Sequence, residues 1–327
     1  MTWLVTGGAG YIGSHVVRAL AMSGADVVVI DDLSTGLRGF VPADVELVTA
    51  NLLDSATVQK TLTRRSVTGV IHIAGYKYAG ESVRFPLHTY RQNVCAMAAL
   101  LEAMVTTKVE QIVFSSSAAT YGTPDTEVVD EQTPTRPESP YGETKLVGEW
   151  LLRDAARASG LRHTSLRYFN VVGSGSELLY DRSPHNLFPK VLDMLYRGQT
   201  PQINGGDYPT PDGTCVRDYV HVSDLALAHV AAATCLASGA LIENVYNLGS
   251  GAGTSVREIM TTMRDVTGIN FDPTVTPRRP GDPARIVATG DLAARDLDWQ
   301  MRHSLTDMVA SAWIARQTAG QSYPTDT

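Results

Sequence analysis

The sequence has few of the features that mark disulfide-rich, membrane-spanning or nucleic-acid-binding proteins. It contains three cysteines, Cys95, Cys215 and Cys235, which are widely spaced and match neither a disulfide framework nor a metal site. Its apolar runs are shorter than the about 18 to 20 residues that cross a membrane. With 34 acidic and 27 basic residues, it also lacks the excess positive charge that attracts nucleic acid or anionic lipid.

The remaining composition is that of an ordinary globular protein. Hydrophobic residues make up 43% of the 327 positions and charged residues 19%, which is enough to bury one large core or two closely joined ones. Residues 2–6 read directly as a strand, without a basic and apolar leader before them. Together with the cysteine usage, this favours a cytoplasmic protein.

The first half of the chain alternates between strand-like and helix-like patterns. Apolar runs predict strands near residues 3–5, 25–30, 45–48, 70–73, 111–114 and 164–167, and apolar positions at helical spacing predict helices near 11–22, 55–62, 87–104 and 141–158. Such alternation is typical of a parallel sheet with helices on both faces. The sequence therefore predicts an α/β fold of the Rossmann-type, doubly wound kind.

After about residue 168 the pattern is less regular. Residues 170–185 and 198–214 predict loops, 273–283 a proline-rich basic connector and 320–327 a loose tail. Helices are expected at 186–196, 222–238 and 304–319, a strand at 244–248, and a capping box at Ser255 to Glu258. We expect a first domain over residues 1–168, with a return segment at 219–249, and a smaller mixed α/β lobe over 169–218 and 250–327.

A glycine-rich turn joins the first expected strand to the first expected helix. Gly7, Gly10 and Gly13 have the GxxGxxG spacing of a dinucleotide-binding turn. Glycine allows a pyrophosphate to approach the backbone, and the helix N-terminus offers free N–H groups. The first domain is therefore expected to bind a dinucleotide.

Acidic residues at the end of the second strand indicate which dinucleotide binds. Asp31 lies where a carboxylate can hydrogen-bond the adenosine ribose. With Asp32 beside it, this charge would repel a 2′-phosphate. The pattern favours NAD, and Arg38 nearby leaves NADP as an alternative.

Tyr141 and Lys145 form a YxxxK pair in an expected helix. Positions i and i+4 share one helix face, so the phenol and the ammonium point the same way. A tyrosine with a pKa of about 10 is a poor base at neutral pH, but a neighbouring cation and the positive ring of NAD would favour its phenolate. Ser117, in the triple serine after the strand at 111–114, lies at the sheet edge where such folds bind ligands and can hydrogen-bond a sugar hydroxyl.

These motifs, in this order, resemble the extended short-chain dehydrogenase/reductase family, and within it the UDP-glucose 4-epimerases. The resemblance covers essentially the whole chain, in segments 6–15, 74–77, 80–83, 115–118, 139–142, 167–170, 207–210, 212–214, 216–222 and 278–282. It implies an isomerase that epimerises a UDP-sugar with tightly bound NAD in galactose metabolism. It also implies a homodimer formed through the helices near 87–104 and 141–158.

The resemblance implies which residues bind the cofactor. Its adenosine and pyrophosphate half would be held by the glycine turn and by Tyr11, Ile12, Asp31, Asp32, Leu33, Ser34, Thr35 and Gly36. Asn51 and Leu52 would flank the adenine, and the family usually has Asp at the position of Asn51. The pocket would be completed by Ile73, Ala74, Gly75, Lys77, Asn93, Ser115, Tyr141, Lys145 and Phe169.

The resemblance likewise implies the substrate site. The sugar and diphosphate would be lined by Lys77, Ser117, Tyr141, Asn170, Asn186 and Leu187. Arg217 and Arg279 would bind the two phosphates and Asp282 the uridine ribose. Gln202 and Asn204 would border uracil, where relatives usually have an aromatic residue at the position of Asn204. Ile286 would limit the room near C2′, and its intermediate size leaves N-acetylhexosamines open.

The implied reaction begins when Tyr141 removes the proton of the sugar 4′-hydroxyl, with Ser117 orienting it, and hydride leaves C4′. The 4-keto sugar then turns about its diphosphate, and hydride and proton return to invert C4′. A 4,6-dehydratase is less favoured, because Ala118 and Ala119 stand where such enzymes carry an Asp–Glu pair. The same motifs are compatible with a UDP-N-acetylglucosamine 4-epimerase, a UDP-glucuronate 4-epimerase or decarboxylase, or an NAD-sensing module.

Overall fold

A computed structural model describes residues 1–279 and 282–322. Its centre is a seven-stranded, parallel sheet in the order β12-β7-β5-β4-β1-β2-β3. In chain order these strands are β1 (Thr2–Thr6), β2 (Asp26–Asp31), β3 (Glu46–Thr49), β4 (Gly69–His72), β5 (Gln111–Ser115), β7 (Arg162–Tyr168) and β12 (Val245–Leu248). The order reverses between β1 and β4, which is the switch point where doubly wound sheets bind ligands. The predicted Rossmann-type fold is confirmed.

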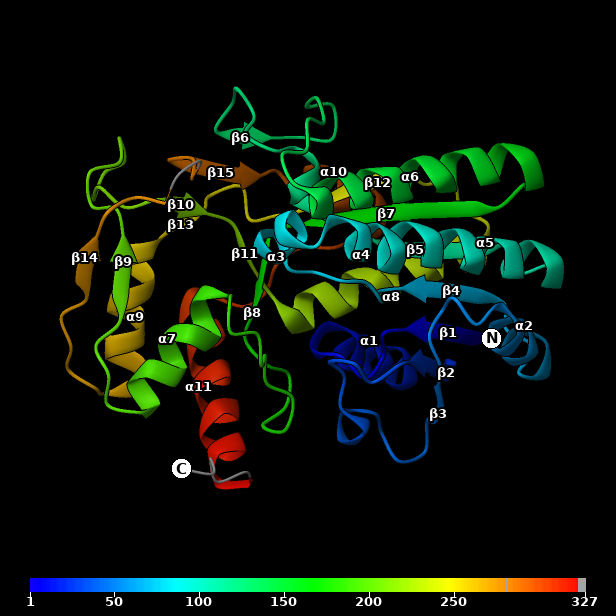
Figure 1. Cartoon of the computed structure of the whole chain (residues 1–327), viewed down its shortest axis with the longest axis horizontal. Coiled ribbons are helices and arrows are strands. Elements are labelled where there is room, and N and C mark those ends of the chain that lie inside the picture. The colour runs from blue at the N-terminus through cyan, green and yellow to red at the C-terminus, as the bar shows by residue number, and fades with distance from the viewer. Residues whose placement is uncertain (280–281, 323–327) are drawn as a thin grey trace.

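Helices cover both faces of this sheet (Figure 1). One face packs against α1 (Tyr11–Met22), α8 (Val222–Ser238) and α10 (Asp291–Leu297), and the other against α2 (Ser55–Arg64), α5 (Ala96–Thr107) and α6 (Pro140–Ser159). In β1, Trp3 and Val5 join the first apolar core and Leu4 joins the second. Because successive strand residues point to opposite faces, a strand covered on both sides is apolar at nearly every position.

Short helical segments surround the carboxyl edge of the sheet. They are η1 (Arg38–Phe40), α3 (Ala79–Arg84), α4 (Pro86–Tyr90), η2 (Arg91–Cys95) and η3 (Ala118–Thr120). The helix expected over 87–104 is thus divided into α4 and α5 by η2, a π-helical turn. Such turns widen the helix locally, and here the turn buries the side chain of Asn93.

The lobe lies beside one end of the sheet (Figure 1). Its core packs α7 (Leu187–Tyr196), α9 (Val256–Thr267) and α11 (Leu305–Ser322) against short strands. The short strands of this region are β8 (Asn170–Val172), β9 (Gln202–Asn204), β10 (Val216–Arg217), β11 (Tyr219–His221), β13 (Thr254–Ser255), β14 (Thr274–Thr276) and β15 (Arg285–Ala288). β15 also pairs with β6 (Val128–Val129), from the first half of the chain. Residues 170–185, 198–214 and 273–283 read as loops from sequence because strands of two or three residues show no periodicity.

Other features of the second half agree more closely with what the sequence predicts. Ser255 Oγ accepts a hydrogen bond from Glu258 N at 3.0 Å, and Glu258 Oε2 accepts one from Ser255 N at 2.7 Å, which confirms the capping box. Helix α11 continues to Ser322, so the expected loose tail is wrong for residues 320–322. Pro280 and Gly281 of the basic connector and residues 323–327 of the tail lie outside the described residues.

The division into two domains stays a prediction. β12, from the expected return segment, does join the main sheet beside β7. Within residues 1–279 and 282–322, no helix combines the length and the hydrophobicity needed to cross a membrane.

Candidate active site

The glycine turn lies at the carboxyl end of β1 and leads into α1. Gly7 has a φ of 72°, in the left-handed region, and a Cβ there would lie 2.7 Å from the backbone nitrogen of Ala74. A Cβ on Gly13 would lie 2.0 Å from the carbonyl oxygen of Gly7. Gly10 precedes the helix and has no side chain with which to cap it. The turn therefore forms a backbone cradle at the positive end of the helix dipole, which fits a dinucleotide pyrophosphate.

Asp31, at the carboxyl end of β2, presents a buried carboxylate beside this cradle. One of its oxygens accepts a hydrogen bond from Ala9 N at 2.9 Å and the other from Leu33 N at 2.8 Å. Burial raises the pKa of Asp31, and the two backbone bonds act in the opposite direction. A Cβ on Gly36 would lie 2.8 Å from Asp31 Oδ1, so the 33–36 loop folds closely over the carboxylate. Each oxygen retains acceptor capacity for a ribose hydroxyl.

Asp32 and Asn51 form a pair next to Asp31. Asn51 Nδ2 donates to Asp32 Oδ2 at 2.8 Å, and Asn51 Oδ1 accepts from Leu53 N at 3.0 Å. Ser34 N and Oγ both donate to Asp32 Oδ1, at 2.9 and 2.6 Å. An aspartate at position 51 would instead face Asp32 with a like charge. Asn51 therefore replaces a repulsion with a hydrogen bond at the expected adenine site.

Asn93 connects the loop after β4 to helix α6. Its Oδ1 accepts from Tyr76 N at 2.7 Å, and its Nδ2 donates to Tyr76 O at 3.0 Å and to Thr144 Oγ1 at 2.9 Å. Both amide hydrogens are thus used within the protein. Thr144 lies between Tyr141 and Lys145, so Asn93 positions the expected cofactor loop against the helix that carries the YxxxK pair.

Tyr141, Lys145 and Ser117 come together at the carboxyl end of β5. Lys145 Nζ donates to the Ser115 carbonyl oxygen at 2.8 Å and lies 5.8 Å from the centre of the Tyr141 ring. The Ser117 side chain lies near enough to the Tyr141 phenol to act on its pKa. The arrangement places a proton-transfer group, a hydroxyl partner and a cation within one small region beside the glycine turn.

Burial moves the pKa values of both members of the YxxxK pair toward their neutral forms. It raises the pKa of Tyr141, and the nearby Ser117 side chain acts in the opposite direction. It lowers the pKa of Lys145 to about 8, although the charge of Glu149 acts to raise it. The lowered pKa expected from the sequence depends on the positive ring of NAD as well as on Lys145, and burial of the phenol acts against it, because burial disfavours the charged phenolate. The protein's own groups therefore leave Tyr141 a neutral phenol at neutral pH.

A buried ion pair next to the expected catalytic residues is missed by the sequence reasoning. Glu149 of α6 accepts from Arg167 of β7, at 2.9 Å from Nε to Oε1 and at 2.5 Å from Nη2 to Oε2. Glu149 Oε1 also accepts from Ser116 Oγ at 2.5 Å. The pair therefore fixes the triple serine against α6. A sequence signal exists, because Glu149 lies four residues after Lys145 on the same helix face.

Three expected substrate residues gather where β10 and β15 run in parallel. Arg217 pairs in register with Ile286. Arg217 Nη2 donates to Asp282 Oδ1 at 2.6 Å, and its Nη1 donates to Val216 O at 2.8 Å. The guanidinium expected to bind phosphate is thus oriented by the carboxylate expected to bind ribose.

Asn204 contacts the second expected phosphate ligand. With the Asn204 amide oxygen facing Arg279, it accepts from Nη2 at 3.0 Å and from Nε at 3.2 Å, and its nitrogen donates to Thr276 Oγ1 at 3.1 Å. Asn204 therefore holds Arg279 at a position where the family usually has an aromatic residue. Gln202 is exposed at the start of the same strand.

The remaining expected residues have the following contacts. Asn170 Nδ2 donates to Asp218 O at 2.9 Å, and Phe169 packs on a small apolar cluster around Tyr121. Asn186 precedes α7 and donates to Asp181 Oδ2 at 2.8 Å. The apolar cores of the protein include Leu52, Ile73, Ala74 and Leu187.

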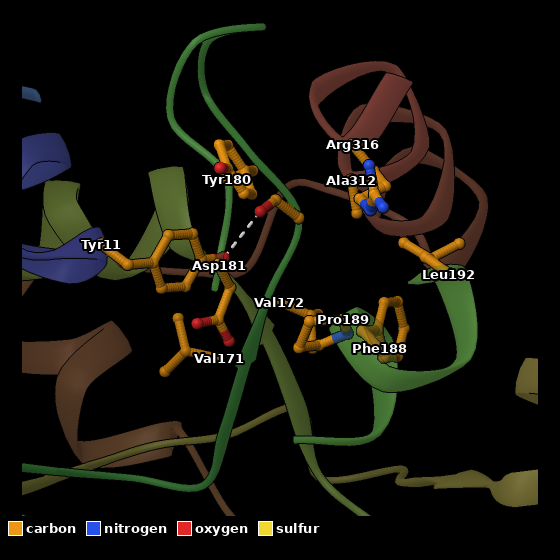
Figure 2. Close-up of a pocket in the computed structure, with 11 residues that line it drawn as sticks. Tyr11, Val171, Val172, Tyr180, Asp181, Phe188, Pro189, Leu192, Ala312 and Arg316 are labelled. Carbon is orange, nitrogen blue, oxygen red and sulfur yellow. Dashed lines mark hydrogen bonds between the residues drawn. The ribbon is translucent and has the colours of Figure 1, made fainter. Parts of the chain in front are cut away.

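Asp181 is a second residue that the sequence reasoning does not single out. Its Oδ1 lies 3.8 Å from Lys77 Nζ, so it lies between Lys77 and Asn186. Figure 2 shows Asp181 with Tyr11 in a small pocket between α1 and α7. The pocket has a volume of about 20 Å³, which admits a water molecule but no sugar. This pocket is therefore not where a nucleotide sugar fits.

The sequence is similar to that of a known protein family. Residues 3–249 match the model of the NAD dependent epimerase/dehydratase family. A UDP-glucose 4-epimerase of Corynebacterium glutamicum is 42% identical over 324 residues, covering 98% of this chain and 97% of that protein. The chain belongs to the NAD dependent epimerase/dehydratase family.

Solved structures extend the likeness to the whole fold. One UDP-glucose 4-epimerase structure has a TM-score of 0.94 and 39% identity, covering 100% of this chain and 99% of that chain. The enzyme of Stenotrophomonas maltophila, solved with NAD and formylated UDP-arabinopyranose, has a TM-score of 0.94 and 38% identity, covering 99% of this chain and 100% of that chain. The epimerase/dehydratase family model ends with β12, whereas these relatives match the lobe as well.

We expect Glu149→Gln to lower the free energy of unfolding by about 3 to 5 kcal/mol, because it leaves the Arg167 guanidinium buried without a charged partner. Urea denaturation of both proteins measures this change. Asp154→Asn in the same helix is the matched control, because Asp154 pairs with Arg153 and Arg157 in solvent and exposed pairs contribute little. Equal denaturation midpoints for the two variants would contradict the prediction.

Proposed function

We propose that this protein interconverts UDP-glucose and UDP-galactose by reversible oxidation at C4 of the sugar. The observation that carries the proposal is the position of the Lys145 ammonium, bonded to the Ser115 carbonyl and 5.8 Å from the centre of the Tyr141 ring, with Ser117 nearby at the same sheet edge. NAD is the cofactor, and the cradle at Gly7 and the buried Asp31 carboxylate fit it.

The proposed proton chemistry is performed by Tyr141. Its phenolate takes the proton of the sugar 4′-hydroxyl, which Ser117 orients by hydrogen bonding. NAD, when bound, supplies the hydride acceptor and donor at C4, and its positive ring favours the phenolate. Lys145 is held by the Ser115 carbonyl and adds a second positive charge beside the phenol. After the sugar has turned, the hydride would return to the opposite face of C4, and Tyr141 would return the proton to the C4 oxygen.

The lobe would hold the UDP group while the sugar turns. Arg217 and Arg279 bind the two phosphates, since each guanidinium is already oriented by a side chain, Asp282 or Asn204. Ile286 lies beside Arg217 in the strand pairing and limits the room around the sugar. A fixed diphosphate and a loosely held sugar are what inversion by rotation requires.

We also propose a homodimer formed through α4 and α6. Leu87 of α4 is 84% exposed and Trp150 of α6 is 48% exposed, and Phe85 at the start of α4 is exposed as well. Exposed large apolar groups on neighbouring helices favour a protein–protein interface. The unpaired cysteines favour a reducing compartment, and we propose that the enzyme acts in galactose metabolism in the cytoplasm.

The purified protein should convert UDP-galactose to UDP-glucose. Tyr141→Phe should lower kcat by roughly 10²- to 10⁴-fold, the usual contribution of general acid–base catalysis, while NAD binding measured by ultrafiltration is retained. Tyr196→Phe, on α7, is the matched control and should keep full activity. The proposal fails if the wild-type protein does not form UDP-glucose, or if Tyr141→Phe turns over normally.

The rate should fall as pH rises through about 8, the value to which burial lowers the pKa of Lys145. Above this pH Lys145 loses its charge, and the Tyr141 phenolate loses the stabilisation that it supplies. Glu149→Gln should move this alkaline limb to lower pH, because the Glu149 charge raises the pKa of Lys145. The dependence of kcat on pH tests both statements, and a profile that stays flat well above pH 8 would exclude this role of Lys145.

Leu87→Glu should convert the dimer to monomers, because it would bury a carboxylate in an apolar interface. Light scattering coupled to gel filtration measures the mass. Leu241→Glu is the control, because Leu241 is 102% exposed in the loop after α8, outside the proposed interface. A Leu87→Glu dimer as stable as the wild type would place the interface elsewhere.

A further inference from the structure

Asp181 is a largely buried acid in the cleft that the proposed chemistry does not use. Its side chain is 9% exposed and lies in the loop between β8 and α7. Oδ1 accepts from Ser183 N at 3.0 Å and lies 3.8 Å from Lys77 Nζ. Oδ2 accepts from Asn186 Nδ2 at 2.8 Å. The carboxylate therefore joins the lobe to the loop after β4.

The negative charge of Asp181 lies beside residues that are expected to contact the sugar. Its two side-chain partners, Lys77 and Asn186, are both residues that we expect to contact substrate. It also lies near Tyr11 and Tyr78. Burial is the larger cause that raises the pKa of both tyrosines, and the charge of Asp181 raises it further. Figure 2 shows its carboxylate beside the Tyr11 ring.

The position of Asp181 would disfavour binding of a negatively charged sugar. A hexose presents only neutral hydroxyl groups, whereas a uronic acid presents a carboxylate. Near Asp181 that carboxylate would meet a like charge, which costs free energy in a partly buried site. Lys77, the cation that could bind it, is already paired with Asp181.

We propose that Asp181 makes the cleft selective for UDP-hexoses and excludes UDP-uronic acids. It does so in two ways, by repelling the sugar carboxylate and by neutralising Lys77. The inference rests on the proposed function and identifies the substrate class of the same site.

Asp181→Asn tests the proposal, because it removes the charge and keeps an oxygen that can accept from Ser183 N. The ratio of kcat/KM for UDP-glucuronate to that for UDP-galactose should rise about tenfold, the order expected for removing one unit charge a few ångström away at a partly screened site. UDP-glucuronate should also inhibit turnover of UDP-galactose about tenfold more tightly. The inhibition constant is informative even where UDP-glucuronate is not turned over.

Two further variants separate charge from loop structure. Asp130→Asn is the matched control, because Asp130 Oδ1 accepts from Gln132 N at 3.0 Å in the same i to i+2 geometry on an exposed loop, and it should change neither ratio nor inhibition. Adding Lys77→Gln to Asp181→Asn should remove the gain with UDP-glucuronate. If Asp181→Asn does not fold, Asp181→Ser, which can also accept from Ser183 N, takes its place.

The outcomes distinguish this inference from the proposed function. If the wild-type protein interconverts UDP-glucose and UDP-galactose but neither the ratio nor the inhibition constant changes in a folded Asp181 variant, selectivity by Asp181 is wrong and the function stands. Efficient epimerisation of UDP-glucuronate by the wild type also overturns it. Failure of the wild type on UDP-galactose overturns the proposed function itself.

Discussion

The Glu149–Arg167 ion pair fixes the end of β5 against α6, and the geometry of the candidate site depends on that contact. Through its bond to Ser116, Glu149 holds the backbone that supplies the Ser115 carbonyl to Lys145 and that carries Ser117 near Tyr141. A buried pair of this kind adds little net stability, since its desolvation offsets its attraction. The ion pair instead fixes the positions of the neighbouring side chains, because proton transfer needs heavy atoms within hydrogen-bonding distance.

Burial of the site disfavours the charged forms of its two titratable residues, and this makes the proposed chemistry depend on the cofactor. It favours neutral Tyr141 and neutral Lys145, so the protein alone makes Tyr141 a poor base. Glu149 offsets part of this effect at Lys145. In the proposed mechanism the charge of the oxidised cofactor supplies the rest. Tyr141 would then be activated only when the hydride acceptor is in place, which limits proton transfer to complexes that can complete the reaction.

Features set by local pattern could be read from the sequence, and features set by distant contacts could not. Periodicity and spacing along single segments predict the parallel sheet, the glycine turn, Asp31 and the YxxxK pair. In the structure the last three lie at the carboxyl edge of that sheet. The inward turn of Asn93 depends on a π-helical turn, which leaves no periodic signal. The contacts of Asp181 with Lys77 and of Asn204 with Arg279 join residues far apart in sequence. The short strands of the lobe exist only through their pairing.

The charges of the cleft are arranged so that its two ends treat a UDP-sugar differently. At the lobe end, Arg217 and Arg279 are held by Asp282 and Asn204 before any phosphate arrives, so little side-chain order is lost on binding. Because the protein has a net charge of −7, its attraction for a diphosphate would have to come from such local cations. At the proposed sugar end, the pairing of Lys77 with Asp181 would leave the sugar without a strong ionic contact. A substrate that is bound through its diphosphate and not through its sugar can rotate the sugar between two hydride transfers, so that the other face of C4 is presented. A sugar bound by an ion pair would resist that rotation.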